Sequence, residues 1–217
     1  MIELYGHLFS SFTWKALIAL YEKEVEFTFH SVTDPEGEAA LARHWLPGKF
    51  PLLIHDGVAI PESSSIIEHL DAAFPGGPRL IPDEPALARE ARLIDRVFDN
   101  KVELQFQAIV GEYLPFITDA PDTKRIARAE AALDEAYRWL DARLAGRRWA
   151  AGEAFTLADC SAAPALFYGD WTRPIPPRHA TLHALRAKLL ARPSVARCVD
   201  DGRPFRHHFP LGAPDRD

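Results

Sequence analysis

The sequence predicts a two-domain α+β protein, with a mixed α/β N-terminal part followed by an all-helical part. Strand patterns alternate with helical patterns before residue 75, and only helical patterns occur after residue 85. The stretch between them, residues 75–85, holds four prolines and two glycines and breaks regular structure. We therefore expect domains at residues 1–75 and 86–217, joined by a linker at 76–85.

The N-terminal part is expected to follow the order βαβαββα. Residues 2–5 form a short apolar strand pattern, and residues 13–21 a helix with Trp14, Leu17 and Ile18 on one face. Residues 25–30 alternate apolar and polar side chains, as a half-buried strand does, and a helix is expected at 36–45. Residues 51–60 predict a hairpin around Asp56-Gly57, followed by a helix at 63–74.

The C-terminal part is expected to contain helices at 86–112, 122–145, 157–168, 180–191 and 194–201, with an irregular tail from Gly202. The apolar periodicity predicts two buried stripes. The stripe of the first helix consists of Leu93, Val97, Leu104 and Ile109. The stripe of the second helix consists of Ile126, Leu133, Tyr137, Leu140 and Leu144. Thr156 and Asp159 predict a capping box at the start of the third helix, which is a structural feature.

Charge and cysteine usage exclude several functions. Lys plus Arg number 25 and Asp plus Glu 31, and a net charge of −6 disfavours sequence-independent nucleic-acid binding. No apolar run approaches the ~20 residues of a membrane helix. The two cysteines lack paired spacing, which argues against a disulfide framework or structural zinc site, and the adjacent His207-His208 pair is not expected to bind metal. We expect a cytoplasmic protein that binds neither nucleic acid nor membrane.

The turn between the first strand and first helix is the first candidate site. Ser10, Ser11 and Thr13 place hydroxyls beside a helix N-terminus, which carries partial positive charge and unpaired N–H groups. Such an end suits an anion, including a thiolate. The structural alternative is ordinary N-capping by serine or threonine.

Two further motifs flank the hairpin. In Lys49-Phe50-Pro51 a cis peptide bond would turn the backbone of Phe50 toward a ligand, whereas the common trans form would simply open a strand. Ser63 is expected to cap the next helix, whose N–H groups suit a carboxylate, and Glu62 suits an ammonium group. Together these two residues match the α-amino-acid end of a ligand, and the alternative is a cap beside a first-turn acid.

The order and spacing of these motifs resemble the glutathione S-transferase family, in its bacterial, serine-type form, over essentially the whole chain. The resemblance is carried by Leu4-Tyr5, Ser10-Ser11, Trp14 through Leu20, Lys49-Phe50-Pro51, Asp56-Gly57, Pro61 through Ile66, and Phe155 through Asp159. It implies a thioredoxin-like, glutathione-binding N-terminal domain and the helical C-terminal domain of that family.

The resemblance also implies residue roles. Ser11 or Ser10 would donate a hydrogen bond to the glutathione sulfur, and the alignment does not choose between them. Glutathione would further be bound by Lys49 near the glycine carboxylate, Phe50 and the cis-proline Pro51 at the cysteinyl part, and Glu62 with Ser63 at the γ-glutamyl end. The electrophile pocket would lie between the domains, with walls from Leu8, Phe9, Phe106, Tyr113 and Trp171.

The energetics of thiol activation are reasonable without a metal. Lowering a thiol pKa from ~8.5 by about two units requires ~2.7 kcal/mol. A hydrogen bond to a charged group contributes ~1.5–3 kcal/mol and a helix N-terminus up to ~2 kcal/mol. One hydroxyl and one helix end therefore suffice.

The implied function is a glutathione transferase that attacks a small hydrophobic electrophile with the glutathione thiolate, in detoxification, as a homodimer. One alternative is a non-catalytic glutathione- or ligand-binding protein, and another is a glutathione-dependent isomerase or oxidoreductase. The turn at 10–13 contains no cysteine, which argues against the cysteine-type classes. Phe12 weakens an isomerase role, and Tyr5 is expected to be a packed strand residue.

Overall fold

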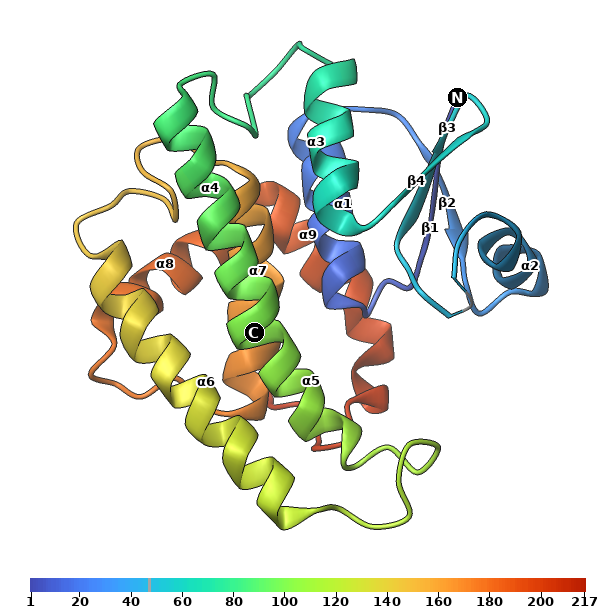
Figure 1. The fold of residues 1–217 in the computed structure, drawn as a ribbon. Coiled ribbons are helices and arrows are strands. Elements are labelled where there is room, and N and C mark those ends of the chain that lie inside the picture. The colour runs from blue at the N-terminus through green and yellow to red at the C-terminus, as the bar shows by residue number, and fades with distance from the viewer. Residues whose placement is uncertain (47) are drawn as a thin grey trace.

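The computed structural model describes residues 1–46 and 48–217, and its N-terminal part contains a four-stranded mixed sheet in the order β2-β1-β3-β4 (Figure 1). The strands are β1 (Ile2–Gly6), β2 (Thr28–Ser31), β3 (Leu52–His55) and β4 (Val58–Pro61). β1 pairs in parallel with β2 and antiparallel with β3, and β3 pairs antiparallel with β4. The expected order βαβαββα is confirmed.

Helices cover both faces of this sheet. α1 (Ser11–Glu22) and α3 (Ser63–Ala73) lie on the side of the helical domain, and α2 (Pro35–His44) lies on the other (Figure 1). The large apolar core continues from α1 and α3 into the helical domain. A separate small cluster of Tyr5, Leu41, Leu52 and Ile54 packs beneath α2.

The second strand begins later than its alternating pattern predicts. Glu24 has a φ of 53°, the left-handed conformation that ends many helices. The N–H of Val25 then donates to the carbonyl of Leu20 at 3.0 Å, so this carbonyl in the last turn of α1 has a hydrogen-bond partner. Because Val25 belongs to this helix-ending turn, pairing with β1 starts only at Thr28.

The hairpin at 51–60 forms as predicted. Asp56 and Gly57 both have positive φ, 48° and 82°, as a two-residue type I′ turn requires. Ile54 and Ala59 face each other across the two strands, which fixes their register.

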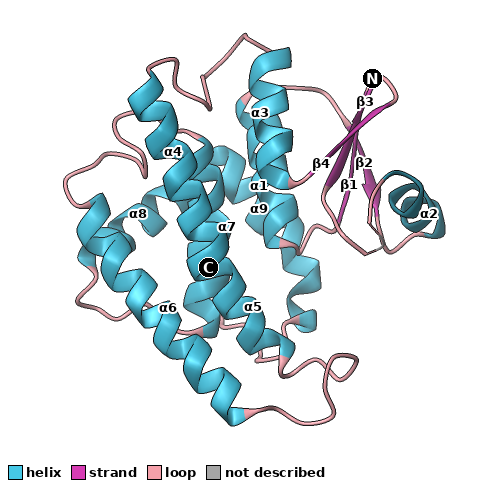
Figure 2. Cartoon of the chain, viewed as in Figure 1, coloured by secondary structure: helices cyan, strands magenta, loops and turns pink. Residues whose placement is uncertain are grey.

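In the residues that the structure describes, the regular elements of the C-terminal part are all helices, joined by loops of which one carries an isolated β-bridge between Trp149 and Gly152 (Figure 2). It begins with α4 (Pro85–Val97), the π-helical segment η1 (Phe98–Glu103) and α5 (Leu104–Gly111). It continues with α6 (Thr123–Leu144), α7 (Leu157–Thr172), α8 (Ala180–Leu190), α9 (Pro193–Gly202) and the 3-10 helix η2 (Arg203–His208). α7 is buried from Leu157 through Trp171 and forms the centre of this domain. Among the described helices, none has the length and apolar character needed to cross a membrane.

The buried stripe predicted for the first long helix is wrong in its phase. Leu93 and Leu104 are 44% and 49% exposed, and Val97 is only half-buried. Ile109 is buried as expected, but the stripe otherwise consists of Ala91, Ile94, Phe98, Val102 and Phe106. The wider π-helical turn at Phe98–Glu103 shifts which side chains face inward, and the acids Asp95 and Glu103 share the buried face. In α6 the predicted stripe is confirmed, although Ile126 is half-buried.

The C-terminal tail is not irregular throughout, as the sequence suggested. Residues Arg203–His208 form a 3-10 helix. The ring of Phe205 contacts His7 with centroids 4.9 Å apart, and Phe209 packs on Trp171 at 5.5 Å. These contacts hold the segment against the rest of the protein.

The capping box that starts α7 is present. The Thr156 side chain accepts from the N–H of Ala158 at 3.3 Å, and Asp159 accepts from the N–H of Thr156 at 2.9 Å. Asp159 also binds the N–H of Ala150 at 2.8 Å and so fixes the preceding loop.

Loss of this cap is expected to destabilise the protein modestly. Thr156→Ala should lower the free energy of unfolding by about 1 kcal/mol, because a buried helix-start N–H loses its acceptor. Urea denaturation measures the change, and Thr156→Ser is the control because it keeps the hydroxyl. Equal stability of Thr156→Ala and wild type would contradict the structural role of this motif.

Candidate functional site

The register of the sheet brings the three predicted motifs to one end of it. Tyr5 near the end of β1 pairs with Leu52 at the start of β3, and Leu52 pairs with Pro61 at the end of β4. The turn after β1, the residues before β3 and those after β4 therefore meet at the same edge. α1 and α3 both begin there, so two helix N-termini also face this region.

The two serines at the start of α1 have different surroundings. Ser10 is the N-cap, and its hydroxyl oxygen accepts from the N–H of Thr13 at 3.3 Å. Ser11 is the first helical residue and is buried, with its hydroxyl hydrogen-bonded to the Glu103 carboxyl. In residues 1–46 and 48–217, the main-chain N–H groups of Ser11 and Phe12 find no acceptor. The opening of α1 thus offers free donors to an anion.

Glu103 is the site residue that the sequence analysis missed. It comes from η1 in the helical domain, is 2% exposed, and also accepts from the side-chain amide of Gln107 at 2.9 Å. Burial raises the pKa of Glu103 to about 8, partly offset by the hydrogen bond from Ser11. Asp95, Asp99 and Glu103 recur at intervals of four residues, a helix-face pattern that could have identified them.

A buried ionic cluster lies next to these residues. The Nζ of Lys15 lies 2.9 Å from Asp95 Oδ1 and 2.8 Å from both carboxylate oxygens of Asp99. Ser64 at the start of α3 donates to Asp95 at 2.9 Å, and Ser161 of α7 donates to the same carboxylate. Burial alone would lower the pKa of Lys15, but the adjacent Asp99 and Asp95 carboxylates raise it overall. The cluster joins α1 and α3 to the helical domain.

The Phe50–Pro51 peptide bond is cis. Pro51 is buried, Phe50 is half-buried against the small cluster under α2, and Lys49 is exposed. The register of β1 and β3 brings these residues to the edge of the sheet where the turn with Ser10 and Ser11 begins, and their contacts with a ligand stay a prediction.

Glu62, and not Ser63, is the N-cap of α3, which corrects the sequence-based expectation. Glu62 makes no side-chain capping bond, and Ser63 is the first helical residue and is buried. Glu62 has a φ of 68°, a conformation that is costly for a non-glycine residue and that clusters at ligand sites. Its carboxylate is exposed beside a helix start that no side chain caps.

Tyr5 is a packed strand residue, as expected. Its ring stacks on His30 with centroids 4.6 Å apart, and its hydroxyl donates to Glu3 at 2.8 Å. Burial and the Glu3 hydrogen bond raise the pKa of Tyr5 to about 12. It belongs to the cluster under α2, on the face of the sheet opposite α1.

The predicted pocket walls only partly come together. Phe9 lies 5.3 Å from Tyr168 and 6.4 Å from Trp171 between ring centroids, and Phe106 lies 6.1 Å from Tyr168. Phe106 and Trp171 are each 5% exposed, whereas Tyr113, at the end of α5, is 42% exposed. The buried indole N–H of Trp171 has no hydrogen-bond partner among the described residues.

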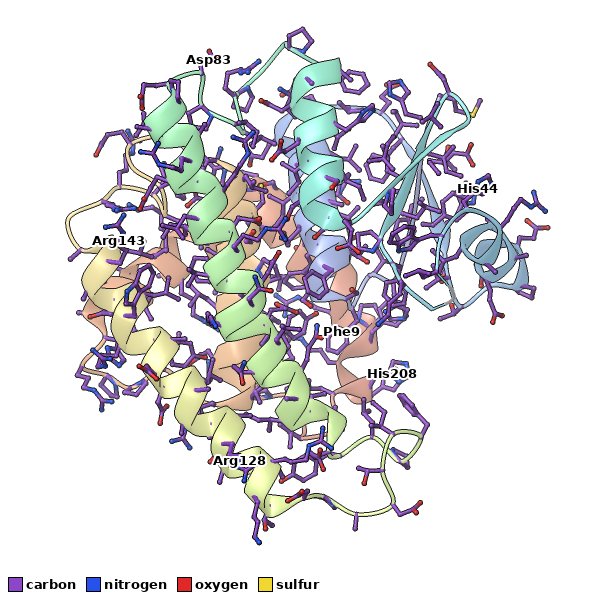
Figure 3. The ribbon with its side chains drawn as sticks, viewed as in Figure 1. Phe9, His44, Asp83, Arg128, Arg143 and His208 are labelled. Carbon is purple, nitrogen blue, oxygen red and sulfur yellow. The ribbon has the colours of Figure 1, made fainter. Side chains whose placement is uncertain are left out.

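Leu8 and the C-terminal segment both adjoin the start of α1, where the Trp14 indole donates to the Leu8 carbonyl at 2.7 Å and Phe205 contacts His7. Leu8 lines a groove of about 1140 Å³ between α1, β2 and α9. Figure 3 shows Phe9 beside the lower end of α1 and His208 on the neighbouring C-terminal segment. Within residues 1–46 and 48–217, no group of three or more His, Cys, Asp or Glu side chains is arranged to hold a metal ion.

Two family models match the chain in sequence order. The model of the glutathione S-transferase N-terminal domain matches residues 4–79, and that of the C-terminal domain matches residues 123–190. The chain belongs to the glutathione S-transferase family. The thioredoxin-like N-terminal domain and helical C-terminal domain expected for that family are confirmed, while the boundaries at 75 and 86 stay a prediction.

Solved glutathione S-transferases share this fold. A glutathione S-transferase from Rhodospirillum rubrum is 28% identical with a TM-score of 0.77, and the match covers 91% of each chain. One from Methylobacillus flagellatus, solved with glutathione bound, is 24% identical with a TM-score of 0.79, covering 91% of this chain and 98% of that one.

Among curated relatives, glutathione transferase GST 23 of Zea mays is 28% identical over 142 residues, or 65% of this chain and 60% of that protein. Glutathione S-transferase U13 of Arabidopsis thaliana is 26% identical over 51% of this chain and 50% of its own length. The chain therefore spans about half to three-fifths of these relatives.

Proposed function

We propose that this protein is a glutathione transferase that activates the glutathione thiol at the start of α1. The observation that carries the proposal is the meeting of two serine hydroxyls, the Phe50–Pro51 segment and the Glu62–Ser63 helix start at one edge of the sheet. Family membership and the glutathione-bound relative from M. flagellatus support glutathione as the co-substrate.

The residues have distinct proposed roles. Glutathione lies with its sulfur at the opening of α1, where the hydroxyl of Ser10 or Ser11 and the free N–H groups favour a thiolate. The main chain of Phe50 beside Pro51 binds the cysteinyl part, and Lys49 lies near the glycine carboxylate. Glu62 receives the γ-glutamyl ammonium, and the start of α3 at Ser63 receives its carboxylate.

The reaction needs no base within the site. The thiol loses its proton to water, and the thiolate then forms a new carbon–sulfur bond to an electrophile. It either displaces a leaving group, which departs with its bonding electron pair, or adds to a double bond, whose displaced electron pair takes up a proton from water. Phe9 packs against Tyr168 and Trp171, and Phe106 also packs on Tyr168, so an aromatic cluster, with Phe106 and Trp171 largely buried, lies behind the turn before α1. We propose on this basis that the substrate is a small hydrophobic electrophile. We also propose that the protein is a cytoplasmic homodimer that acts in detoxification.

Substitution of the two serines tests this proposal. Removing the hydroxyl that donates to the sulfur should raise the pKa of the bound thiol by about one to two units, the equivalent of one hydrogen bond to a charged group. An ultraviolet titration of bound thiolate in wild type, Ser10→Ala and Ser11→Ala measures the shift. Turnover of an aryl halide, compared with a disulfide substrate, separates transferase from oxidoreductase activity.

The titration can also refute the mechanism. If neither substitution shifts the thiol titration, hydroxyl activation is wrong, and glutathione binding without catalysis becomes the better description. Ser10→Thr is the matched control, since it keeps both the hydroxyl and the helix cap.

A further inference from the structure

Glu103 brings a carboxyl group from the helical domain to the first residue of α1. Its Oε1 contacts the Ser11 hydroxyl and accepts the Gln107 amide at 2.9 Å. In the described part of the chain, its Oε2 makes no hydrogen bond. Because this carboxyl group contacts the proposed thiolate-binding serine directly, it decides whether the hydroxyl hydrogen of Ser11 is available to a ligand sulfur.

The Ser11 hydroxyl has a single hydrogen to donate. If Glu103 is a carboxylate, it is acceptor-only and takes that hydrogen, so nothing remains for a ligand sulfur. If Glu103 is a neutral carboxylic acid, its own O–H donates to the Ser11 oxygen, and the hydroxyl hydrogen of Ser11 can turn to the sulfur. The contact between the heavy atoms is the same in both arrangements.

We propose that Glu103 is a positioning residue for thiolate binding, which in its neutral form frees the Ser11 hydrogen for the sulfur and in its ionised form withdraws it. The proposal rests on the proposed function and deepens it in two ways. It assigns Ser11 as the residue whose hydroxyl donates a hydrogen bond to the glutathione sulfur, and it assigns Glu103 of the helical domain as the group that controls this donation. No proton passes from the thiol to Glu103, whose own proton exchanges with water.

The surroundings of Glu103 favour its neutral form at neutral pH. Burial raises its pKa to about 8, the Ser11 hydrogen bond acts in the opposite direction, and the charge of Asp99 on η1 raises the pKa further. Lys15 on α1 is the nearby cation and lowers it, but Asp95 and Asp99 bind its ammonium group. On α7, Tyr168 faces Glu103 and is uncharged, since burial raises its own pKa well above the ordinary value.

The proposal predicts how the preference for glutathione over an analogue without an ionisable thiol changes with pH. The affinity for glutathione is compared with that for S-methylglutathione, which has the same peptide but no ionisable thiol. The affinity ratio is the affinity for glutathione divided by the affinity for S-methylglutathione. In wild type this ratio should rise with pH as the bound thiol ionises, and it should then fall about tenfold or more above pH ~8 as Glu103 ionises. Calorimetric titrations at intervals from pH 6 to 9.5 measure the ratio.

Glu103→Gln is the decisive variant because its side-chain amide can donate to Ser11 at every pH. Its ratio should rise and stay at its maximum, without the alkaline fall. Ser11→Ala should show a lower ratio at neutral pH and no alkaline fall, and it provides the same information if Glu103→Gln fails to fold. Glu112→Gln changes another buried glutamate, at the end of α5, and should follow wild type.

Each outcome has a clear meaning. An alkaline fall that persists in Glu103→Gln or Ser11→Ala would overturn the role of Glu103 while leaving thiolate activation intact. A wild type that never prefers glutathione over S-methylglutathione would overturn the proposed function itself, and the role of Glu103 with it.

Discussion

Replacing Lys15 with methionine is expected to lower the free energy of unfolding by about 3–5 kcal/mol. Lys15 is 1% exposed, and its ammonium group is the cation that binds Asp95 at 2.9 Å and Asp99 at 2.8 Å. Methionine fills a similar volume but leaves the buried Asp95 and the partly buried Asp99 carboxylates facing each other without a counter-charge. Leaving a buried charge unpaired costs far more than losing a surface ion pair.

Urea denaturation of purified variants measures this loss. Lys101→Met is the matched control, since Lys101 lies exposed on η1 and its replacement should change stability by no more than about 0.5 kcal/mol. Adding Asp95→Asn and Asp99→Asn to Lys15→Met should recover part of the loss, because the uncompensated charges are then gone. A Lys15→Met protein as stable as Lys101→Met would show that the cluster does not hold the domains together.

Local patterns predicted the N-terminal domain well because its signals are contained in short segments. The Asp56-Gly57 turn fixes the hairpin, since both residues adopt the positive φ that such a turn requires. The start of β2 could not be predicted, because the turn that Glu24 and Val25 make at the end of α1 takes the first residues of the alternating pattern.

The helical domain shows where apolar periodicity fails. The stripe through Leu93 and Leu104 fits an ideal α-helix, but α4 already turns Ala88, Ala91 and Ile94 inward and leaves Leu93 exposed. Leu104 follows the π-helical segment Phe98–Glu103 and is exposed as well. Apolar periodicity also gives no weight to acids, although Asp95, Asp99 and Glu103 lie on the inward face. Asp95 and Glu103 are buried and Asp99 is partly buried, because their partners, Lys15 and Ser11, come from the other domain.

The same limit applies to the candidate site. The three motifs around Ser10, Pro51 and Glu62 were predictable, since each is a turn or helix start with its own residue preferences. The four-residue spacing from Asp99 marks Glu103 as one of the acids on a shared helix face, but its contact with Ser11 was not predictable, because it forms only when α1 packs against η1. Sequence patterns identify which groups begin helices, whereas the pairing of a hydroxyl with a carboxyl from 92 residues away depends on tertiary packing.

Glu103→Gln is expected to make the protein's stability less sensitive to alkaline pH. The pKa of Glu103 is raised from 4.5 to about 8 in the folded state, chiefly by burial. Between these values the folded protein holds a proton that the unfolded chain has lost. The stability that this proton contributes is fully present below pH 4.5 and is lost as pH rises through 8. Between pH 5 and pH 8 the free energy of unfolding of wild type should therefore fall by about 3–4 kcal/mol relative to Glu103→Gln.

Denaturation of both proteins across this pH range measures the difference between their free energies of unfolding. The most informative result is which of the two proteins is the more stable at each pH. At pH 5 the two should be similarly stable, because both side chains are uncharged, and near pH 8 the glutamine variant should be the more stable one. A parallel series with Glu112→Gln accounts for effects common to any glutamate-to-glutamine change. If the two curves instead diverge toward acid pH, with wild type losing stability there, then Glu103 is ionised at neutral pH and the Ser11 hydrogen belongs to its carboxylate.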